Sequence, residues 1–237
     1  MTVALVGVYR ARNARYVREV SRPALERGWT VAWWALDGLA DELADVTVGA
    51  GAGAKFDLLN EILRTLPGSF DWLVVSDDDL VFTRGDVVSL QRCCERAGLD
   101  LAQPGRADAA VSHGITAARR LSRARRTSFV EIGPLFVVGP RWRDRIVPFP
   151  PGSGMGWGLE LDWFGLAEEG CVLGIVDSLP VRHEGTAGED YDAPAEFARL
   201  QQLFAARGVG TWADVQRTLD TWRPWQPWPR WASKLSP

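Results

Sequence analysis

Apolar positions along the chain repeat with two different periods, and the pattern predicts strands that alternate with helices. Apolar runs typical of buried strands occupy Val3–Val8, Thr30–Leu36 and Trp72–Val75. Between them, the stretch that ends at Arg27 and the segment Lys55–Leu66 carry apolar side chains at helical spacing. Gly28 and Pro67-Gly68 are typical stop signals for these two helices.

The same alternation continues through the middle of the chain. We expect a helix over Asp86–Arg96 that closes at Gly98, and another helix that begins near Trp157–Trp163. The strand-like segments are Leu99–Gln103, Phe129–Val138 with a break at Gly133-Pro134, and Cys171–Val176, which leads to Asp177 and His183. This order predicts an α/β fold, a Rossmann-like, mostly parallel sheet flanked by helices on both faces.

The C-terminal segment has a pattern of its own. Pro194–Arg207 reads as an amphipathic helix, and Thr211 with Asp214 resembles the capping box of a second helix. That second helix would carry Trp212, Val215, Leu219 and Trp222. We therefore expect a main domain over residues 1–190, with residues 191–237 as a helical and Trp/Pro-rich appendage packed on it.

Four tryptophans recur every third residue among prolines near the C-terminus, at positions 222, 225, 228 and 231. A polyproline II helix has three residues per turn and would align their rings. We expect the rings to clamp the tail onto the body of the protein. A surface for carbohydrate or for a membrane is the alternative interpretation.

Composition narrows the classes of function. The 237 residues are 46% hydrophobic, with a formal net charge of -3 and an isoelectric point near 5.5, which favours neither nucleic acid nor an anionic membrane as partner. The 3 cysteines include adjacent Cys93 and Cys94 and form no disulfide framework, so we expect reduced thiols in a cytoplasmic protein. The N-terminal run is a poor signal peptide, and no segment approaches the roughly 20 apolar residues of a transmembrane helix.

One segment departs from the apolar pattern. Residues 106–127 carry a basic group of side chains, namely Arg119, Arg120, Arg123, Arg125 and Arg126. Two interpretations are open: a solvated, mobile loop, or a lid that meets phosphate or an anionic acceptor.

The candidate chemistry lies at the ends of the predicted strands. Three carboxylates, Asp77, Asp78 and Asp79, directly follow the buried run Trp72–Val75. In open α/β sheets ligands collect at the carboxyl ends of the strands, so this triad is placed to hold a cation, although a solvated turn is the alternative. Glu160 and Asp162 at a helix start and His183 after the last strand should reach the same edge. Carboxylates favour Mg²⁺ or Mn²⁺, and the imidazole shifts the preference toward Mn²⁺.

A metal ion held by few protein ligands completes its coordination with substrate phosphates and water. The predicted substrate therefore carries a diphosphate, whose departure the cation would stabilise. Glu160, flanked by Trp157 and Trp163, is placed to act as a base whose pKa its apolar neighbours raise. The alternative for Glu160 is an acid that interacts with the helix dipole.

The combined motifs resemble the GT-A fold of glycosyltransferases: an Asp-X-Asp motif after a buried strand, an acidic motif in a Trp-Gly loop and helix, and a late histidine. More narrowly, the segment from about Lys55 to Gly185 resembles a plant and bacterial family long catalogued as a domain of unknown function and regarded as glycosyltransferase-like. The motifs that carry this likeness are Ala102–Pro104, Ser112–Arg120, Phe129–Ile132, Gly156–Glu160 and Gly174–Ser178 with His183.

The resemblance implies roles for single residues. Asp79 and His183 match metal ligands, Asp77 a ligand or ribose contact, and Asp78 a further donor contact. Glu160 stands where the family usually has Asp, which makes Asp162 a second candidate for the base. By the general GT-A pattern alone, the nucleobase lies at the ends of the first two strands and a lysine approaches the nucleotide, which here are Val8, Tyr9, Arg10, Asp37 and Lys55.

We therefore expect a metal-dependent glycosyltransferase that uses a nucleotide-diphosphate sugar, with UDP favoured over GDP. An acceptor hydroxyl or amine would attack with inversion of configuration. Two alternatives from other classes stay open: a nucleotidyltransferase or phosphohydrolase, and a binding module without catalysis. The sequence leaves the acceptor, the sugar and the oligomeric state undetermined.

Overall fold

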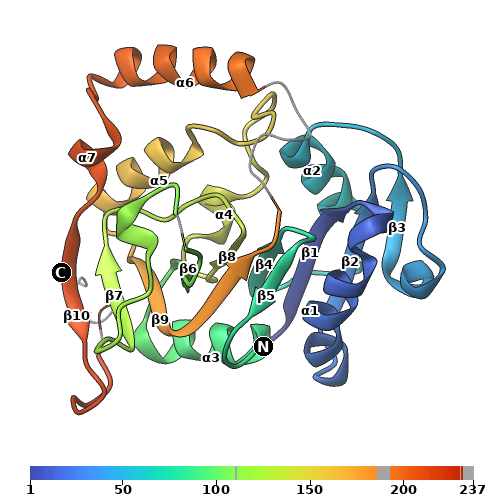
Figure 1. Cartoon of the computed structure of the whole chain (residues 1–237), viewed down its shortest axis with the longest axis horizontal. Helices are drawn as coiled ribbons and strands as arrows, with labels where there is room; N and C mark the ends of the chain where they lie inside the picture. Colours follow the sequence, from blue (N-terminus) through green and yellow to red (C-terminus); the bar gives the residue numbers. More distant parts are fainter. Residues whose placement is uncertain (110, 186–192, 230, 232–237) are drawn as a thin grey trace.

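The computed structural model describes residues 1–109, 111–185, 193–229 and 231 (Figure 1). A sheet of 10 strands runs through the described residues in the order β10-β7-β9-β6-β8-β4-β1-β2-β3, and β5 pairs with β9 off this path. The strands are β1 (Val3–Tyr9), β2 (Thr30–Ala35), β3 (Thr47–Ala50), β4 (Trp72–Ser76), β5 (Leu80–Phe82), β6 (Leu101–Arg106), β7 (Ala124–Thr127), β8 (Leu135–Val138), β9 (Leu173–His183) and β10 (Thr218–Trp222). The α-helices are α1 (Ala14–Glu26), α2 (Lys55–Thr65), α3 (Val87–Ala97), α4 (Arg143–Ile146), α5 (Leu159–Glu168), α6 (Ala193–Arg207) and α7 (Trp212–Val215), and the 3₁₀ segments are η1 (Ala11–Asn13), η2 (Asp41–Val46) and η3 (Gly114–Thr116).

Helices cover both faces of the sheet because its central strands are buried on both sides. Along β1, Val3 and Leu5 pack into the same cluster as α1 and α3. Ala4 and Val6 point to the opposite face and pack with α2, α4 and α5. Side chains alternate between the faces of a strand, so a strand covered on both faces is apolar throughout. The predicted α/β fold is confirmed.

The direction of the strands changes across the sheet. β3, β2, β1 and β4 are parallel neighbours, as are β6 and β9. β8 runs antiparallel to both β4 and β6, and β7 runs antiparallel to β9. The sheet is therefore parallel on the N-terminal side and mixed beyond β4.

The expectation of a solvated loop is wrong for the end of the arginine-rich segment. Residues Ala124–Thr127 form β7, and Arg125 is fully buried there. Its Nε and Nη2 each donate to a carboxylate oxygen of Asp177 at 2.8 Å, and Nη1 donates to the carbonyl of Ile115 at 2.7 Å. The apolar pattern missed this strand because a buried ion pair, and not an apolar side chain, occupies the position.

The predicted second C-terminal helix is also largely wrong. The capping box at Thr211 and Asp214 is present, but α7 ends at Val215 and Thr218–Trp222 forms β10, which pairs antiparallel with β7. Spacing alone could not distinguish these outcomes, because the apolar residues of this segment fit a helix, whereas pairing with β7 selects a strand.

The tryptophans of the tail do not form one aligned stripe. Trp222 and Trp231 are 3% and 1% exposed and pack in the cluster of α1 and α3, whereas Trp225 and Trp228 are 66% and 41% exposed. The expected clamp is confirmed for the two buried rings. Residues 186–192, which contain the expected domain boundary, and 232–237 lie outside the described residues, and the division into two domains stays a prediction.

Two strand boundaries also differ from the prediction. Of the segment Phe129–Val138 only Leu135–Val138 forms a strand, and β9 extends past Val176 to include His183. None of the helices in the described ranges combines the length and hydropathy that a bilayer-spanning helix needs.

The buried pair of Arg125 and Asp177 gives a prediction for stability. Arg125→Met should lower the free energy of unfolding by about 3–5 kcal/mol, because it leaves a buried carboxylate without a partner. Urea denaturation measures the loss. Arg126→Met, at the next position of β7, is the control and should cost less than about 1 kcal/mol. Equal losses in the two variants would contradict a special role for the buried pair.

Candidate active site

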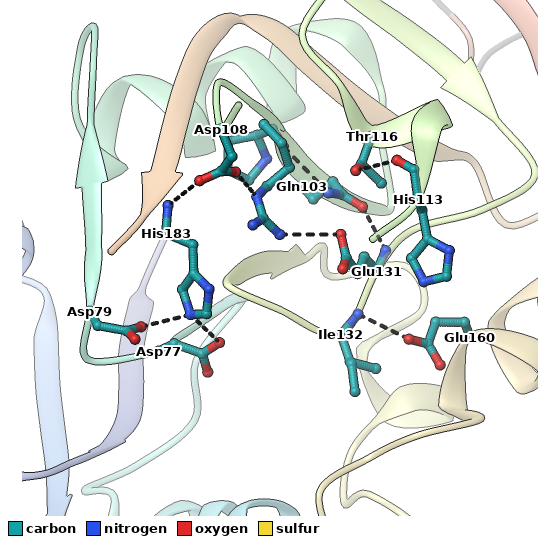
Figure 2. Close-up of polar contacts among 12 residues, drawn as sticks. Asp77, Asp79, Gln103, Asp108, His113, Thr116, Glu131, Ile132, Glu160 and His183 are labelled. Atoms are coloured by element: carbon teal, nitrogen blue, oxygen red, sulfur yellow. Dashed lines mark hydrogen bonds and ion pairs between the residues drawn. The ribbon is translucent and has the colours of Figure 1, made fainter. Parts of the chain in front are cut away.

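The acidic triad lies at the edge of the sheet because of how the chain leaves β4. Asp77 follows the buried strand, and its backbone N–H donates to the carbonyl of Pro134 at 2.7 Å. The chain then turns into β5, which pairs antiparallel with the end of β9 so that Leu80 lies opposite His183. This pairing brings the triad beside the histidine, as Figure 2 shows for Asp77 and Asp79.

The three predicted metal ligands, Asp77, Asp79 and His183, lie close together at this point. His183 Nε2 lies 2.8 Å from Asp79 Oδ1 and 4.0 Å from Asp77 Oδ2 (Figure 2). Burial disfavours the charged imidazolium, but the neighbouring Asp79 and Asp77 outweigh that effect and raise the pKa of His183 above its usual value. The other oxygen of Asp77 is 2.5 Å from Nζ of Lys55, so the predicted lysine also reaches the cluster.

Two glycines leave room around the carboxylates. A Cβ atom at Gly185 would lie 2.0 Å from Oδ2 of Asp79, and one at Gly133 would lie 2.8 Å from Oδ2 of Asp77. Neither distance is compatible with a side chain at these positions unless the carboxylates move.

The side chains at this point suit a divalent cation that takes only some of its ligands from the protein. Oδ1 of Asp79 is buried and faces Nε2 of His183 at 2.8 Å, with no other polar partner in the described part of the chain. Carboxylate oxygens and an imidazole nitrogen suit Mn²⁺ or Mg²⁺. Within the described residues, however, no three or more His, Cys, Asp or Glu side chains gather closely enough to form a metal centre by themselves. An ion bound here would complete its coordination from another molecule.

Asp78 makes different contacts from its two neighbours. Its Oδ2 accepts hydrogen bonds from the backbone N–H of Arg10 at 2.7 Å and from Nδ2 of Asn13 at 3.1 Å. Burial raises the pKa of Asp78 to about 6, against the effect of the Arg10 hydrogen bond, and the charges of its acidic neighbours add to the rise. These contacts tie the triad to the segment that follows β1.

The positions predicted for the nucleobase lie at the ends of β1 and β2. Val8 and Tyr9 are buried, and the hydroxyl of Tyr9 is 3.0 Å from Oγ1 of Thr47. Asp37 accepts a hydrogen bond from the backbone N–H of Ala11 at 2.9 Å. The structure thus brings Arg10 and Asp37 to the sheet edge that carries the triad, whereas the Tyr9 ring belongs to the core.

Glu160 is buried at the start of α5. Gly158, with a left-handed φ of 101°, is the N-cap of the helix, and Oε2 of Glu160 accepts the Gly158 N–H at 3.0 Å. Oε1 accepts the N–H of Ile132 at 3.4 Å. Burial outweighs these hydrogen bonds and raises the pKa of Glu160 to about 7. The predicted rise in this pKa is therefore present.

Asp162 lies elsewhere. Its carboxylate pairs with Arg207 of α6, and its side chain is 39% exposed. It lines a surface hollow with Arg145 and Glu169, so the structure does not bring Asp162 to the cluster of Asp77, Asp79 and His183.

A second buried glutamate was missed by the sequence analysis as a site residue. Glu131 is 7% exposed, and its backbone N–H donates to Oε1 of Gln103 at 2.6 Å. Burial raises the pKa of Glu131 to about 7, although the charges of Arg106 and His183 oppose the rise. Two sequence signals point to it: a carboxylate inside the apolar run Phe129–Ile132, and the place of that run among the motifs that carry the family resemblance.

Arg106 links Glu131 to the histidine. Its Nη1 is 3.5 Å from Oε2 of Glu131, and its Nε is 2.5 Å from Oδ2 of Asp108. The other oxygen of Asp108 accepts the backbone N–H of His183 at 2.7 Å (Figure 2). One chain of polar contacts thus connects the Glu131 side chain to the backbone of His183.

Comparisons with solved structures show what fold surrounds this site. The crystal structure of S. aureus TarS residues 1–349 has a TM-score of 0.53 and 9% identity, over 87% of this chain and 65% of that chain. The same fragment in complex with UDP-GlcNAc has a TM-score of 0.53 and 9% identity, over 87% of this chain and 66% of that chain. The crystal structure of GalNAc-T7 with UDP, GalNAc and Mn²⁺ has a TM-score of 0.56 and 10% identity, over 86% of this chain and 48% of that chain. The fold is GT-A-like.

The similar proteins are longer than this chain and distant from it in sequence. The chain spans less than two thirds of the TarS fragment and about half of GalNAc-T7, and at these identities the likeness shows the fold alone. No family model and no curated protein matches the sequence. The narrower resemblance to the plant and bacterial family therefore stays a prediction.

The raised pKa of Glu160 predicts how Glu160→Gln changes the pH dependence of stability. The folded protein holds this proton more tightly than the unfolded chain, whose value is near 4.5, so ionisation through about pH 7 opposes folding. The variant has no such proton. Its free energy of unfolding should therefore rise relative to wild type between about pH 4.5 and pH 7.

Urea denaturation at a series of pH values measures this difference. The exposed substitution Glu26→Gln is the control and should follow wild type throughout. A Glu160→Gln curve that also runs parallel to wild type would show that this carboxyl group does not titrate as its burial requires.

Proposed function

We propose that this chain is a metal-dependent glycosyltransferase that moves a sugar from a nucleotide-diphosphate sugar to an acceptor hydroxyl or amine. The observation that carries the proposal is the convergence of Asp77, Asp79 and His183 at one sheet edge of a GT-A-like fold. The ligands of the similar structures, UDP-GlcNAc in one and UDP with Mn²⁺ in another, support it by analogy.

On the donor side, Asp79 and His183 would hold Mn²⁺ or Mg²⁺, with Asp77 as a further ligand or a ribose contact. Bound there, the cation would neutralise charge on the leaving diphosphate. Lys55, buried against Asp77, holds that carboxylate in place and brings a positive charge to the diphosphate side. Arg10 and Asp37 would border the nucleobase, for which we favour uracil.

On the acceptor side, Glu160 would act as the base. It takes the proton from the acceptor while the acceptor oxygen or nitrogen bonds to the anomeric carbon. The bond from that carbon to the phosphate oxygen breaks, and its electron pair leaves with the diphosphate. Attack opposite the leaving group inverts the configuration. Hydrogen bonds from Gly158 and Ile132 orient the carboxylate, and its pKa of about 7 suits a base near neutral pH.

Glu131 is the rival for this role. It also has a pKa of about 7, and the charges of Asp77 and His183 act on it directly. Its pairing with Arg106, however, suits a group that positions the histidine through Asp108. We assign Glu131 that positioning role and Asp162 a surface ion pair.

Donor binding should depend on metal and nucleotide together. UDP with Mn²⁺ should stabilise the protein against heat, by about 2.7 kcal/mol when the nucleotide is at a hundred times its dissociation constant, and either one alone should have little effect. GDP should act more weakly. A thermal-shift assay measures the response, which Asp79→Asn and His183→Ala should abolish.

Asp41→Asn, an exposed acidic position in η2, is the control for this assay and should respond like wild type. Stabilisation by UDP that needs no metal and survives in Asp79→Asn would contradict the assignment of the donor site.

Turnover should identify the base. Glu160→Gln should lower kcat by a factor of about 10²–10⁴, the range typical of a lost general base. Asp162→Asn should stay within about threefold of wild type, because an exposed ion pair contributes little. A larger loss in Glu131→Gln than in Glu160→Gln would transfer the role to Glu131.

Product analysis distinguishes the reaction classes in the same assay. Release of UDP accompanies sugar transfer, whereas UMP or pyrophosphate indicates a nucleotidyltransferase or phosphohydrolase. Donor binding without any product would indicate a binding module.

A further inference from the structure

The structure divides the arginine-rich segment into two parts with different environments. Arg125 is buried and paired with Asp177. Arg119, Arg120 and Arg123 instead line a cavity of about 440 Å³, together with Arg84 from the turn after β5. Four arginine residues thus line one hollow in a protein whose net charge is -3. The guanidinium group of Arg123 also donates to the carbonyl of Pro224 at 3.3 Å and lies over the Trp222 ring. We define this hollow, with its four arginines, as the arginine cavity.

The positive charge of the arginine cavity is not balanced by acidic side chains of the described residues. None of the four arginines forms an ion pair there. Asp177 is the one carboxylate in the lining, and both its oxygens already accept from Arg125 at 2.8 Å. Burial lowers the pKa of Arg119, the charge of Arg125 adds to the effect, and the charge of Asp177 opposes it.

A buried hydroxyl in the same lining also lacks a partner. Ser122 is 6% exposed, and its Oγ has no hydrogen bond within the described part of the chain. A buried hydroxyl without a partner destabilises the folded protein. A rotation of the Ser122 hydroxyl toward the arginine cavity would let it donate to an oxygen of a bound ligand. This observation is independent of the charges and indicates a ligand with an acceptor oxygen.

We propose that the arginine cavity binds a phosphoryl group carried by a small molecule. Guanidinium groups bind phosphate oxygens in bidentate pairs, and a dianion balances more of the local charge than a carboxylate does. The cavity volume leaves room for the group that carries the phosphate.

The arginine cavity is separate from the proposed donor site, so this inference goes beyond the proposed function. Its lining contains none of the residues assigned to the metal, the nucleotide or the base. Pro180 of β9 lines it, and His183 follows three residues later, about 10 Å along a strand. A phosphoryl group bound here therefore lies near the donor site without sharing its ligands.

Calorimetry with inorganic phosphate, at low salt and with EDTA to remove divalent cations, tests the proposal. Wild type should bind phosphate at least tenfold more tightly than acetate. Arg84→Gln combined with Arg119→Gln should weaken phosphate binding at least tenfold. Neither side chain forms a hydrogen bond or ion pair within the described residues. Ser122→Ala should weaken it severalfold without a change in charge.

The matched control is Arg22→Gln combined with Arg27→Gln. Both arginines are exposed at α1, and the two substitutions remove the same amount of charge. It should bind phosphate like wild type. No phosphate binding by wild type, an equal loss in the two double variants, or an unchanged affinity in Ser122→Ala would overturn the proposal.

The donor site is measured separately in the same proteins. UDP with Mn²⁺ should bind the Arg84→Gln and Arg119→Gln double variant as it binds wild type. If wild type binds phosphate but does not bind UDP with Mn²⁺, the proposed function is refuted and the proposal for the arginine cavity is supported. Loss of UDP and Mn²⁺ binding in the double variant would contradict the separation of the two sites.

Discussion

The short antiparallel pairing of β5 with β9 is the constraint on which the site depends. It places Leu80 opposite His183, and only this register holds the imidazole 2.8 Å from Asp79, across more than a hundred residues of sequence. A shift of one residue would turn the side chains of β5 to the other face of the sheet. The triad at the end of β4 would then keep its place beside β1 but lose its histidine.

Compensation of buried charge is the second requirement, and the protein meets it with cations from distant elements. Lys55 of α2 pairs with Asp77, Arg106 of β6 lies between Asp108 and Glu131, and Arg125 of β7 pairs with Asp177. Each carboxylate without such a partner would be costly to bury. Glu160 has no cation within this arrangement, only backbone N–H groups, and its pKa is raised accordingly. Where cations exceed carboxylates, at the arginine cavity, the imbalance favours an anion from solution.

The sequence predicted those features that depend on local pattern. The buried run before Asp77 and the order of strands and helices follow from periodicity, and the position of His183 follows from its place after an apolar run. Glu131 was missed because its neighbours are apolar and its partner Arg106 lies 25 residues away. The spacing of apolar residues in Thr218–Trp222 predicts a helix, whereas pairing with β7 makes this segment the strand β10. Features fixed by distant partners are those that a single sequence hides.

The central claim is that Asp79 and His183 hold a divalent ion together with a diphosphate. A crystal structure of the protein with UDP and Mn²⁺, with the ion located by its anomalous scattering, tests it most directly. We predict one manganese peak bonded to a carboxylate oxygen of Asp79, to Nε2 of His183 and to the diphosphate. UDP bound with no manganese peak at these two side chains, or a peak elsewhere in the molecule, would contradict the account.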